Sequence, residues 1–425
     1  MNIIEKTASH GFLGEHEIAS VISESMSQLD PDGRRVLVIV PDTTRTAPVP
    51  LLFRCLCDLL LHRAEKLDFL VALGTHPPLS EEAMLTHFGL SAGEKAERYG
   101  AVELMNHRWD LNGDLTTLGE IPAHEVSALS DGLLNESIPV QLNRRILNYD
   151  LILIAGPVFP HEVVGFSGGN KYFFPGIAGP DIVHATHWLG ALLTNTRING
   201  TKKTPIRDVM DRAASFIPVE KKCLALVTTH SGVKGIFFGS PEAAWSKAAD
   251  LSAVTHIQYT DRLYHTVLGV APQMYDDLWV AGKVMYKLEP VVSDNGRLII
   301  YAPHISEVSY THGRLIDETG YHVRDYFLKQ PDRFKGTPRA VMAHSTHVRG
   351  TGVFENGVEK PRIEVILATR IPEIRCRKIN LGYMNYRDVI LSEYQNRENE
   401  GILFVENAGE TLYRHQHSPG KGQKG

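Results

Sequence analysis

The stretch Arg35-Val-Leu-Val-Ile-Val-Pro41 decides the fold class of this chain. Its β-branched and aliphatic residues, ended by a proline, predict a buried strand. Residues 51–63 follow with apolar side chains at spacings of four, which is typical of an amphipathic helix. Residues 66–74 predict the next strand. A strand, a helix and a strand in this order predict parallel pairing in an α/β sheet.

The same alternation continues along the chain. Further strands are predicted at residues 150–156, 223–229, 264–270, 296–302 and 362–369, with a helix at 276–288. We therefore expect two α/β domains with largely parallel sheets, at residues 1–260 and 261–414, and an active site in the interdomain cleft. Residues 415–425 are polar and rich in glycine, which predicts a disordered tail.

Composition limits the class of protein. The 425 residues carry 44 Lys and Arg against 49 Asp and Glu, a net charge of −5, and no basic block, which argues against binding to nucleic acid. No apolar run approaches the roughly 20 residues of a membrane helix, and the N-terminus lacks the pattern of a signal peptide. Four cysteines form no disulfide framework or zinc spacing. We expect a cytoplasmic enzyme without a nucleic-acid or membrane partner.

Polar side chains follow three consecutive predicted strands. Asp42 and Arg45 come after the first, His76 after the second, and His161 and then Lys171 after the third. In an open α/β sheet, ligands bind beyond the carboxyl ends of the strands, so this convergence predicts a site. Each residue also has a structural explanation: Asp42 could cap the next helix, Arg45 could form a surface ion pair, and His76 could lie in solvent.

Two further motifs are candidates for binding. Ser167-Gly-Gly-Asn-Lys171 combines paired glycines, which allow a nest of backbone amides for an anion, with a lysine at its mouth. It is not a Walker motif, because Gly-Lys-Ser/Thr is absent. His184 and His187 share one face of a helix expected from Pro180, a spacing that could bind zinc but is weak evidence for it.

Together these residues resemble the nickel-dependent lactate racemase family, whose members racemise or epimerise 2-hydroxy acids. The resemblance covers nearly the whole chain. It rests on Asp42-x-x-Arg45, the Gly-x-His loop at His76, His161 ten residues before Lys171, Gly168-Gly-Asn-Lys-Tyr-Phe-Phe-Pro-Gly176, His187 sixteen residues after Lys171, and Lys283 in the second domain.

The resemblance implies a cofactor, the nickel-pincer nucleotide. This is a pyridinium-3-thioamide-5-thiocarboxylic acid mononucleotide that holds nickel through two sulfurs and a ring carbon. By the same resemblance, Lys171 would attach it through a thioamide bond and His187 would bind the nickel. Asp42 and the backbone of Gly168 and Gly169 would seat the nucleotide. Enzymes that make and load the cofactor would be partners of the chain.

The resemblance also implies roles toward the substrate, a small 2-hydroxy acid. His76 and His161 would be the acid/base pair, and Arg45 and Lys283 would hold substrate oxygens. A hydrogen beside a carboxylate is poorly acidic, so it would leave as hydride to the pyridinium and return to the opposite face. Inversion then needs a proton acceptor and a proton donor at two positions, which two histidines provide.

One departure from the family concerns the substrate. Lactate-type members carry a Tyr-Gln pair just ahead of the second-domain lysine, where this chain has Trp279-Val280. We therefore expect a longer or polyhydroxylated acid, such as an aldonate, rather than lactate. Polar residues in loop-like contexts could bind the extra hydroxyls or could simply lie on the surface: His304, His312, Ser345, Thr346 and His347.

Two other interpretations stay open on the sequence. A zinc hydrolase would gather His161, His184 and His187 around an activated water. A relative of the family that binds the nucleotide without catalysis would also keep the fold. That second interpretation leaves two separated histidine bases without a role.

Overall fold

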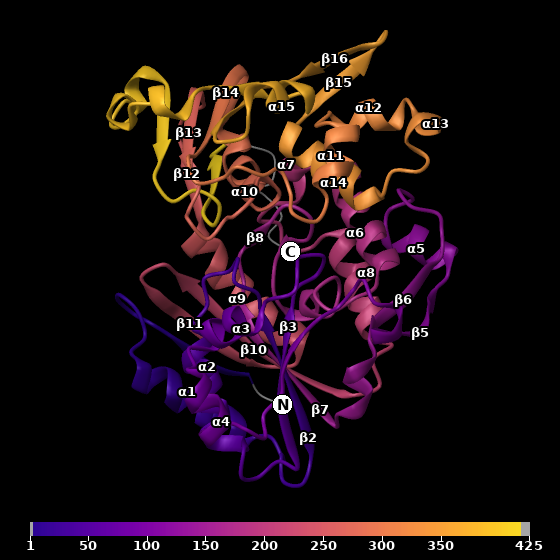
Figure 1. The fold of residues 1–425 in the computed structure, drawn as a ribbon, viewed down its shortest axis with the longest axis vertical. Helices are drawn as coiled ribbons and strands as arrows, with labels where there is room; N and C mark the ends of the chain where they lie inside the picture. The colour runs from indigo at the N-terminus through magenta and orange to yellow at the C-terminus, as the bar shows by residue number, and fades with distance from the viewer. Residues whose placement is uncertain (1–2, 418–425) are drawn as a thin grey trace. The chain divides into compact units, whose positions relative to one another are not determined.

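A computed structural model describes residues 3–417, which divide into two compact units (Figure 1). The first unit holds the chain up to residue 159, residues 167–183 and residues 207–253. The second holds residues 160–166, residues 184–206 and the chain from residue 254 on. Both units are mixed α/β structures with mostly parallel sheets, as the alternation of strands and helices predicted.

The division differs from the predicted domains 1–260 and 261–414, because two short segments leave the first stretch. Residues 160–166 and 184–206 pack within the second unit: Lys287 Nζ donates to the carbonyl of Pro160 at 2.6 Å, and Asn195 Nδ2 donates to the carbonyl of Tyr286 at 3.0 Å. His161 and His187 therefore belong to the second unit. Such contacts between distant residues leave no local signal in the sequence.

The first unit is built on a seven-stranded sheet in the order β1-β11-β10-β7-β2-β3-β4. Pairing is parallel from β10 to β4 and antiparallel at β11 and β1. The strands are β1 (Ile4–Thr7), β2 (Arg35–Pro41), β3 (Lys66–Ala72), β4 (Leu104–Asn106), β7 (Leu151–Pro157), β10 (Glu220–Thr229) and β11 (Gly232–Gly239). The helices are α1 (Glu15–Ser27), α2 (Val49–Leu60), α3 (Glu81–Phe88), α4 (Ala92–Arg98), α5 (Ala123–Leu129), α8 (Pro205–Ala214) and α9 (Pro241–His256). Strands β5 (Leu115–Ile121) and β6 (Ile138–Asn143) pair antiparallel in a separate small sheet.

The predicted central strand is confirmed at its exact bounds. Every residue from Val36 to Val40 is fully buried, which explains the unbroken apolar run. Helix α2 buries Leu52, Phe53 and Leu56 against the sheet, and the rings of Phe53 and Phe69 lie 4.8 Å apart. Each such side chain stabilises the fold by about 1.5–3 kcal/mol.

The second unit has a parallel five-stranded sheet in the order β18-β17-β14-β13-β19. Its strands are β13 (Tyr264–Val270), β14 (Val292–Ala302), β17 (Glu364–Thr369), β18 (Gly382–Tyr383) and β19 (Ile402–Val405). Its helices are α7 (Asn195–Ile198), α10 (Leu278–Leu288), α11 (Gly313–Thr319), α12 (Arg324–Leu328), α13 (Pro331–Phe334), α14 (Arg339–Arg349) and α15 (Glu373–Lys378). Helix α6 (Pro180–Leu193) begins in the first unit and ends in the second.

Three small two-stranded sheets complete the second unit: β8 (Pro160–His161) with β9 (Gly165–Phe166), β12 (Ile257–Thr260) with β20 (Leu412–His415), and β15 (Gly352–Glu355) with β16 (Val358–Pro361). The start of the predicted tail is corrected by β20, in which His415 pairs with Thr260. Residues 418–425 of that tail lie outside the described residues.

The crevice of the first sheet lies where the order of the strands reverses. Strand β2 has β3 on one side and β7 on the other, so the loops after β2 and β7 diverge at that point. The buried phenol of Tyr172 fills this position. A Cβ added to Gly156 would come within 1.8 Å of the Tyr172 hydroxyl oxygen and 3.2 Å of Pro41 Cδ, so only glycine fits here.

We expect Gly156→Ala to lower the free energy of unfolding by about 2 kcal/mol or more, because the methyl group overlaps Tyr172. Urea unfolding measures the change. Gly113→Ala is the control in the same unit, since nothing lies within 4 Å of its added Cβ. Equal stability of the two variants would contradict the placement of Tyr172.

Candidate functional site

Asp42 and His76 form the centre of the site in the first unit. Asp42 follows β2 directly, and its Oδ2 lies 2.5 Å from Nδ1 of His76, which follows β3. Asp42 Oδ1 accepts hydrogen bonds from the amide and the hydroxyl of Thr44, at 3.2 and 2.8 Å. Since a carboxylate only accepts, the Nδ1 of His76 carries the proton and Nε2 keeps its lone pair. Asp42 therefore both holds its turn and orients the histidine.

Lys171 lies next to this pair along the sheet edge. Its segment forms a turn of 3₁₀-helix at Gly169–Tyr172, entered through Gly168 and Gly169 with φ of 84° and 58°. The amide of Gly74, in the loop of His76, donates to the carbonyl of Gly176 at 2.9 Å. The loop of His76 and the segment of Lys171 are thus joined by backbone.

Arg45 acts on the same edge through its charge. Burial raises the pKa of Tyr172 well above its usual value, and the positive charge of Arg45 opposes that shift. Arg45 itself is half-buried, and so is Lys171. The structure therefore brings together four of the predicted residues, Asp42, Arg45, His76 and Lys171, as the convergence of strand ends predicted.

Residues far along the chain hold the glycine loop from behind. Trp245 on α9 donates from Nε1 to the carbonyl of Ser167 at 2.9 Å, and Arg207 on α8 donates to that of Gly168 at 3.2 Å. The Arg207 guanidinium stacks 4.1 Å from the centre of the Trp245 ring. Burial lowers the pKa of Arg207 to about 10. Neither residue was predicted from the sequence, because no local motif indicates that Arg207 and Trp245 contact the glycine loop.

The loop is held by side-chain contacts as well. Asn170 Nδ2 donates to Asp211 Oδ1 at 2.9 Å and to Glu242 Oε1 at 2.8 Å. Burial raises the pKa of Asp211. Burial raises the pKa of the Cys223 thiol, and the nearby backbone of Gly169 opposes that shift.

His161 lies in the β8–β9 turn of the second unit and is 5 % exposed. The amide of Val163 donates to its Nδ1 at 3.1 Å, and Glu162 Oε2 lies 3.5 Å from the same nitrogen. Histidine Nδ1 thus acts as an acceptor, the opposite of the arrangement at His76.

His187 and Lys283 are the other predicted residues in the second unit. The helix expected from Pro180 is confirmed as α6, and His184 on it accepts the amide of Ala340 at 3.4 Å, which gives this histidine a structural role. Lys283 on α10 is buried, and its Nζ lies 4.8 Å above the ring of Tyr275. Asp277 caps α10, accepting the amide of Val280 at 2.9 Å.

Trp279 lies in the first turn of α10 and contacts two histidine rings. The ring of His344 stacks 3.8 Å from that of Trp279 at 21°, and the ring of His312 lies 4.5 Å away. Both nitrogens of His344 meet phenols, that of Tyr286 at 2.8 Å and that of Tyr321 at 3.3 Å. Burial, followed by neighbouring histidines, lowers the pKa of His344 well below its usual value, so the ring is neutral.

The predicted loop around Ser345, Thr346 and His347 is wrong, because these residues lie on α14 and are buried. Ser345 Oγ donates to the carbonyl of Gly320 at 2.8 Å, and Thr346 Oγ1 donates to that of Ala343 at 2.9 Å. The segment looked like a loop because its polar residues hide the apolar spacing of a helix. Local hydrogen bonds satisfy their hydroxyl groups instead.

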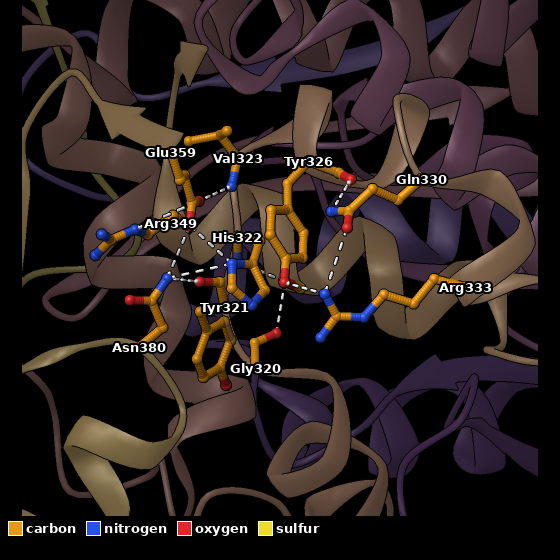
Figure 2. A network of polar contacts seen from close by, with 11 residues as sticks. Gly320, Tyr321, His322, Val323, Tyr326, Gln330, Arg333, Arg349, Glu359 and Asn380 are labelled. Atoms are coloured by element: carbon orange, nitrogen blue, oxygen red, sulfur yellow. Dashed lines mark hydrogen bonds and ion pairs between the residues drawn. The ribbon is translucent and has the colours of Figure 1, made fainter. Parts of the chain in front are cut away.

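Ser345 belongs to a polar network that anchors the β15–β16 hairpin. Figure 2 shows His322, Glu359 and Asn380 of this network. Its Oγ accepts the amide of His322 at 2.9 Å. Glu359 of the hairpin accepts hydrogen bonds from His322 Nδ1 at 2.8 Å, the Val323 amide at 2.6 Å and Asn380 Nδ2 at 2.9 Å. This network fixes the fold of the second unit and removes Ser345 from the candidates for substrate binding.

Metal-ligating side chains do not cluster in the described part of the chain. Among residues 3–417, no group of three or more His, Cys, Asp or Glu side chains is placed to hold a metal ion. The zinc site of His161, His184 and His187 is therefore not assembled. Within the same residues, no helix is both long and apolar enough to span a membrane.

Comparisons with known proteins match part of this chain to a known family. Residues 15–199 match the family described as the lactate racemase N-terminal domain. This stretch contains Asp42, Arg45, His76, Lys171 and both histidines of the second unit that were singled out, His161 and His187. Residues 15–199 of this chain belong to the lactate racemase N-terminal domain family.

Two curated members of the lactate racemase family are similar over part of their length. The lactate racemase of Thermoanaerobacterium thermosaccharolyticum is 25 % identical over 167 residues, and that of Lactiplantibacillus plantarum is 24 % identical over 169. Each match covers 39 % of this chain and 35 % of the relative. The matched stretch thus spans about a third of the length of each curated relative.

Solved structures extend the likeness to most of this chain. A Thermotoga maritima protein solved by the Northeast Structural Genomics Consortium is 32 % identical, with a TM-score of 0.89 over 96 % of this chain and 100 % of that one. The lactate racemase apoprotein of Thermoanaerobacterium thermosaccharolyticum is 17 % identical, with a TM-score of 0.73 over 95 % and 94 % of the two chains. This second likeness concerns the fold alone.

The buried His347 predicts a loss of stability in acid. Burial lowers its pKa to about 4 in the folded chain. In the unfolded chain the ring has its ordinary pKa and binds a proton below about pH 6.5, so acid favours unfolding. The stability is complete above pH 6.5 and falls by roughly 3 kcal/mol on its account as the pH drops to 4. Urea unfolding across this range should show a shallower pH dependence for His347→Leu.

The control for this measurement is His10→Leu, because His10 is exposed. That variant should keep the pH dependence of the parent chain. An unchanged pH dependence in His347→Leu would contradict the burial of a neutral imidazole at this position.

Proposed function

We propose that this chain is an isomerase, a racemase or epimerase of a 2-hydroxy acid that works with a nickel-pincer nucleotide. The observation that carries the proposal is the contact of Asp42 with His76. The loop of His76 is in turn joined by a backbone hydrogen bond to the segment of Lys171. These contacts support the proposal, because they join the loop of an oriented histidine to the segment of a lysine that the family likeness assigns to the cofactor.

His76 is suited to remove the hydroxyl proton of the substrate. Its Nε2 holds the lone pair, because Nδ1 donates to Asp42. When Nε2 takes the proton, the ring becomes a cation and the carboxylate 2.5 Å away stabilises it. We assign His161 the complementary role, since inversion requires a second proton-transfer group.

The residues present fit the proposed cofactor. A nucleotide that brings two sulfurs and a carbon to nickel needs one protein ligand, and the half-buried His187 would supply it. Lys171 would attach the nucleotide. When bound, such a group supplies an electron-poor ring that accepts a hydride, which no side chain can do.

Arg45 and Lys283 supply the positive charge for a substrate that is an anion. A guanidinium matches a carboxylate in two hydrogen bonds, and an ammonium stabilises an oxyanion. The burial of Lys283 strengthens its charge interactions, because little water competes for it. We propose that Asp42 has two roles. It orients His76, and it helps to seat the nucleotide, as the family likeness implies.

The substrate we propose is a longer or polyhydroxylated acid, such as an aldonate epimerised at C2. Trp279 presents an aromatic face, fixed by His344 and His312, where lactate-type members have a hydroxyl and an amide. Of the residues considered for extra hydroxyls, Ser345 and Thr346 are engaged in the fold. His312 and His304 are the ones we retain.

The test of the cofactor proposal is intact mass and nickel content of protein made together with the enzymes that build the cofactor. We expect a nucleotide-sized adduct on Lys171 with near-stoichiometric nickel. Lys171→Ala should lose the adduct, and His187→Ala should keep the adduct and lose nickel. An unmodified, nickel-free chain from cells that load a known family member would overturn the proposal.

The substrate is tested by turnover on lactate and on a panel of aldonates. We expect the loaded chain to prefer an aldonate and the double variant Trp279→Tyr, Val280→Gln to shift its preference toward lactate. Trp109→Tyr, a half-buried residue of the first unit, is the matched control and should leave the preference unchanged. Activity on lactate equal to that on every aldonate would refute this choice.

A further inference from the structure

His161 and its neighbour Glu162 lie close together in the β8–β9 hairpin. His161 pairs with Gly165 in the β8–β9 hairpin, so Glu162 and Val163 lie in a tight turn beside the imidazole. The carbonyl of Pro160 is fixed by Lys287 at 2.6 Å. The ring of His161 is therefore held in a rigid frame, 5 % exposed.

The turn determines which nitrogen of the neutral ring carries the proton. The Val163 amide donates to Nδ1 at 3.1 Å, so Nδ1 has the lone pair and Nε2 has the hydrogen. In this tautomer Nε2 cannot accept a proton. Donation from Nε2 would leave an imidazolate anion, which is unfavourable near neutral pH. His161 needs a partner at Nδ1 before it can exchange protons through Nε2.

Glu162 is placed to be that partner. Its Oε2 lies 3.5 Å from the Nδ1 of His161, on a side chain that is only 15 % exposed. Burial raises the pKa of Tyr286 on α10 and lowers that of His347 on α14, and the negative charge of Glu162 acts on both pKa values in the upward direction, so the carboxylate lies near these buried groups. Lys287 is a further charged group near this turn, and its Nζ donates to the carbonyl of Pro160.

We infer that Glu162 is a positioning residue for His161: its carboxylate accepts the Nδ1 proton of the charged imidazole and so makes Nε2 the nitrogen that exchanges protons with the substrate. The inference rests on the proposed function for the identity of that substrate, a 2-hydroxy acid. It concerns Glu162, which lies outside the motifs that relate this chain to the family.

The proton balance of this role is simple. A proton binds Nδ1 of neutral His161, which breaks the hydrogen bond from Val163 and forms one to Glu162. The imidazolium then releases the Nε2 proton to the substrate oxygen and remains as the neutral tautomer with hydrogen on Nδ1. That tautomer can take a proton back at Nε2. No oxidant or other reactant takes part.

The same device is already complete in the first unit, where Asp42 holds the Nδ1 proton of His76 at 2.5 Å. Each unit thus supplies one imidazole with its own carboxylate. The two pairs differ before the reaction begins. His76 has a lone pair on Nε2 and can accept a proton there. His161 must first bind a proton at Nδ1, and it can then donate one from Nε2. This difference assigns opposite starting roles to two chemically identical side chains.

The experiment is ¹⁵N NMR of the histidine rings in the full chain, titrated with acid, for the parent, Glu162→Gln and Glu162→Asp, with His161→Gln to assign the signal. At high pH the parent should show Nδ1 unprotonated and Nε2 protonated. We expect Glu162→Gln to weaken proton binding by His161 about tenfold, because an amide does not compensate the charge of the ring. Glu162→Asp should restore most of it.

Asp42→Asn is the matched control and should change the signals of His76 while leaving those of His161 unaltered. A titration of His161 that is the same in the parent and in Glu162→Gln would overturn the inference, as would a parent ring with the proton on Nδ1 at high pH. These readouts need neither cofactor nor turnover, so they hold or fail separately from the proposed function.

Turnover gives a second readout in protein that carries the cofactor. Glu162→Gln should shift the pH profile of kcat toward lower pH and change KM little, since Glu162 acts through His161 and does not touch the substrate. A loss of activity with an unshifted pH profile would contradict a positioning role.

Discussion

The parallel pairing of β2 with both β3 and β7 is the constraint on which the site of the first unit depends. Ile39 of β2 is in register with Leu70 of β3 and with Ile154 of β7, so all three strands end at one edge. The chain must therefore deliver Asp42, His76 and the segment of Lys171 to the same place. Apolar burial along β2 stabilises this arrangement, and the polar residues that follow the strands carry the chemistry.

Within each unit, hydrogen bonds decide what the imidazole of that unit can do. A histidine ring has two nitrogens, and the partner of one determines the protonation of the other. Asp42 leaves a lone pair on Nε2 of His76, while the Val163 amide leaves a hydrogen on Nε2 of His161. A reaction that inverts a stereocentre needs both properties. The fold obtains them from a side chain after β2 and from a backbone amide in a turn.

The sequence predicted correctly the strands and helices whose own residue pattern favours them. The β-branched run at 35–41 and the spacing of α10 gave correct elements, and strand ends correctly brought Asp42 to His76. The membership of His161 in the second unit and the support of Gly168 by Arg207 depend on contacts between distant residues, which no local pattern encodes. A loop was predicted where the structure has helix α14, because the polar residues of this helix are buried with their own hydrogen-bond partners.

The most direct test of the central claim is the fate of deuterium at C2 of a deuterated 2-hydroxy acid during turnover by protein that carries the cofactor. If the hydrogen leaves as hydride and returns to the opposite face, the inverted product keeps the deuterium at C2, whatever the proton exchange at His76 and His161. Loss of the deuterium to solvent at the rate of inversion would show that a carbanion forms instead, and would contradict the account.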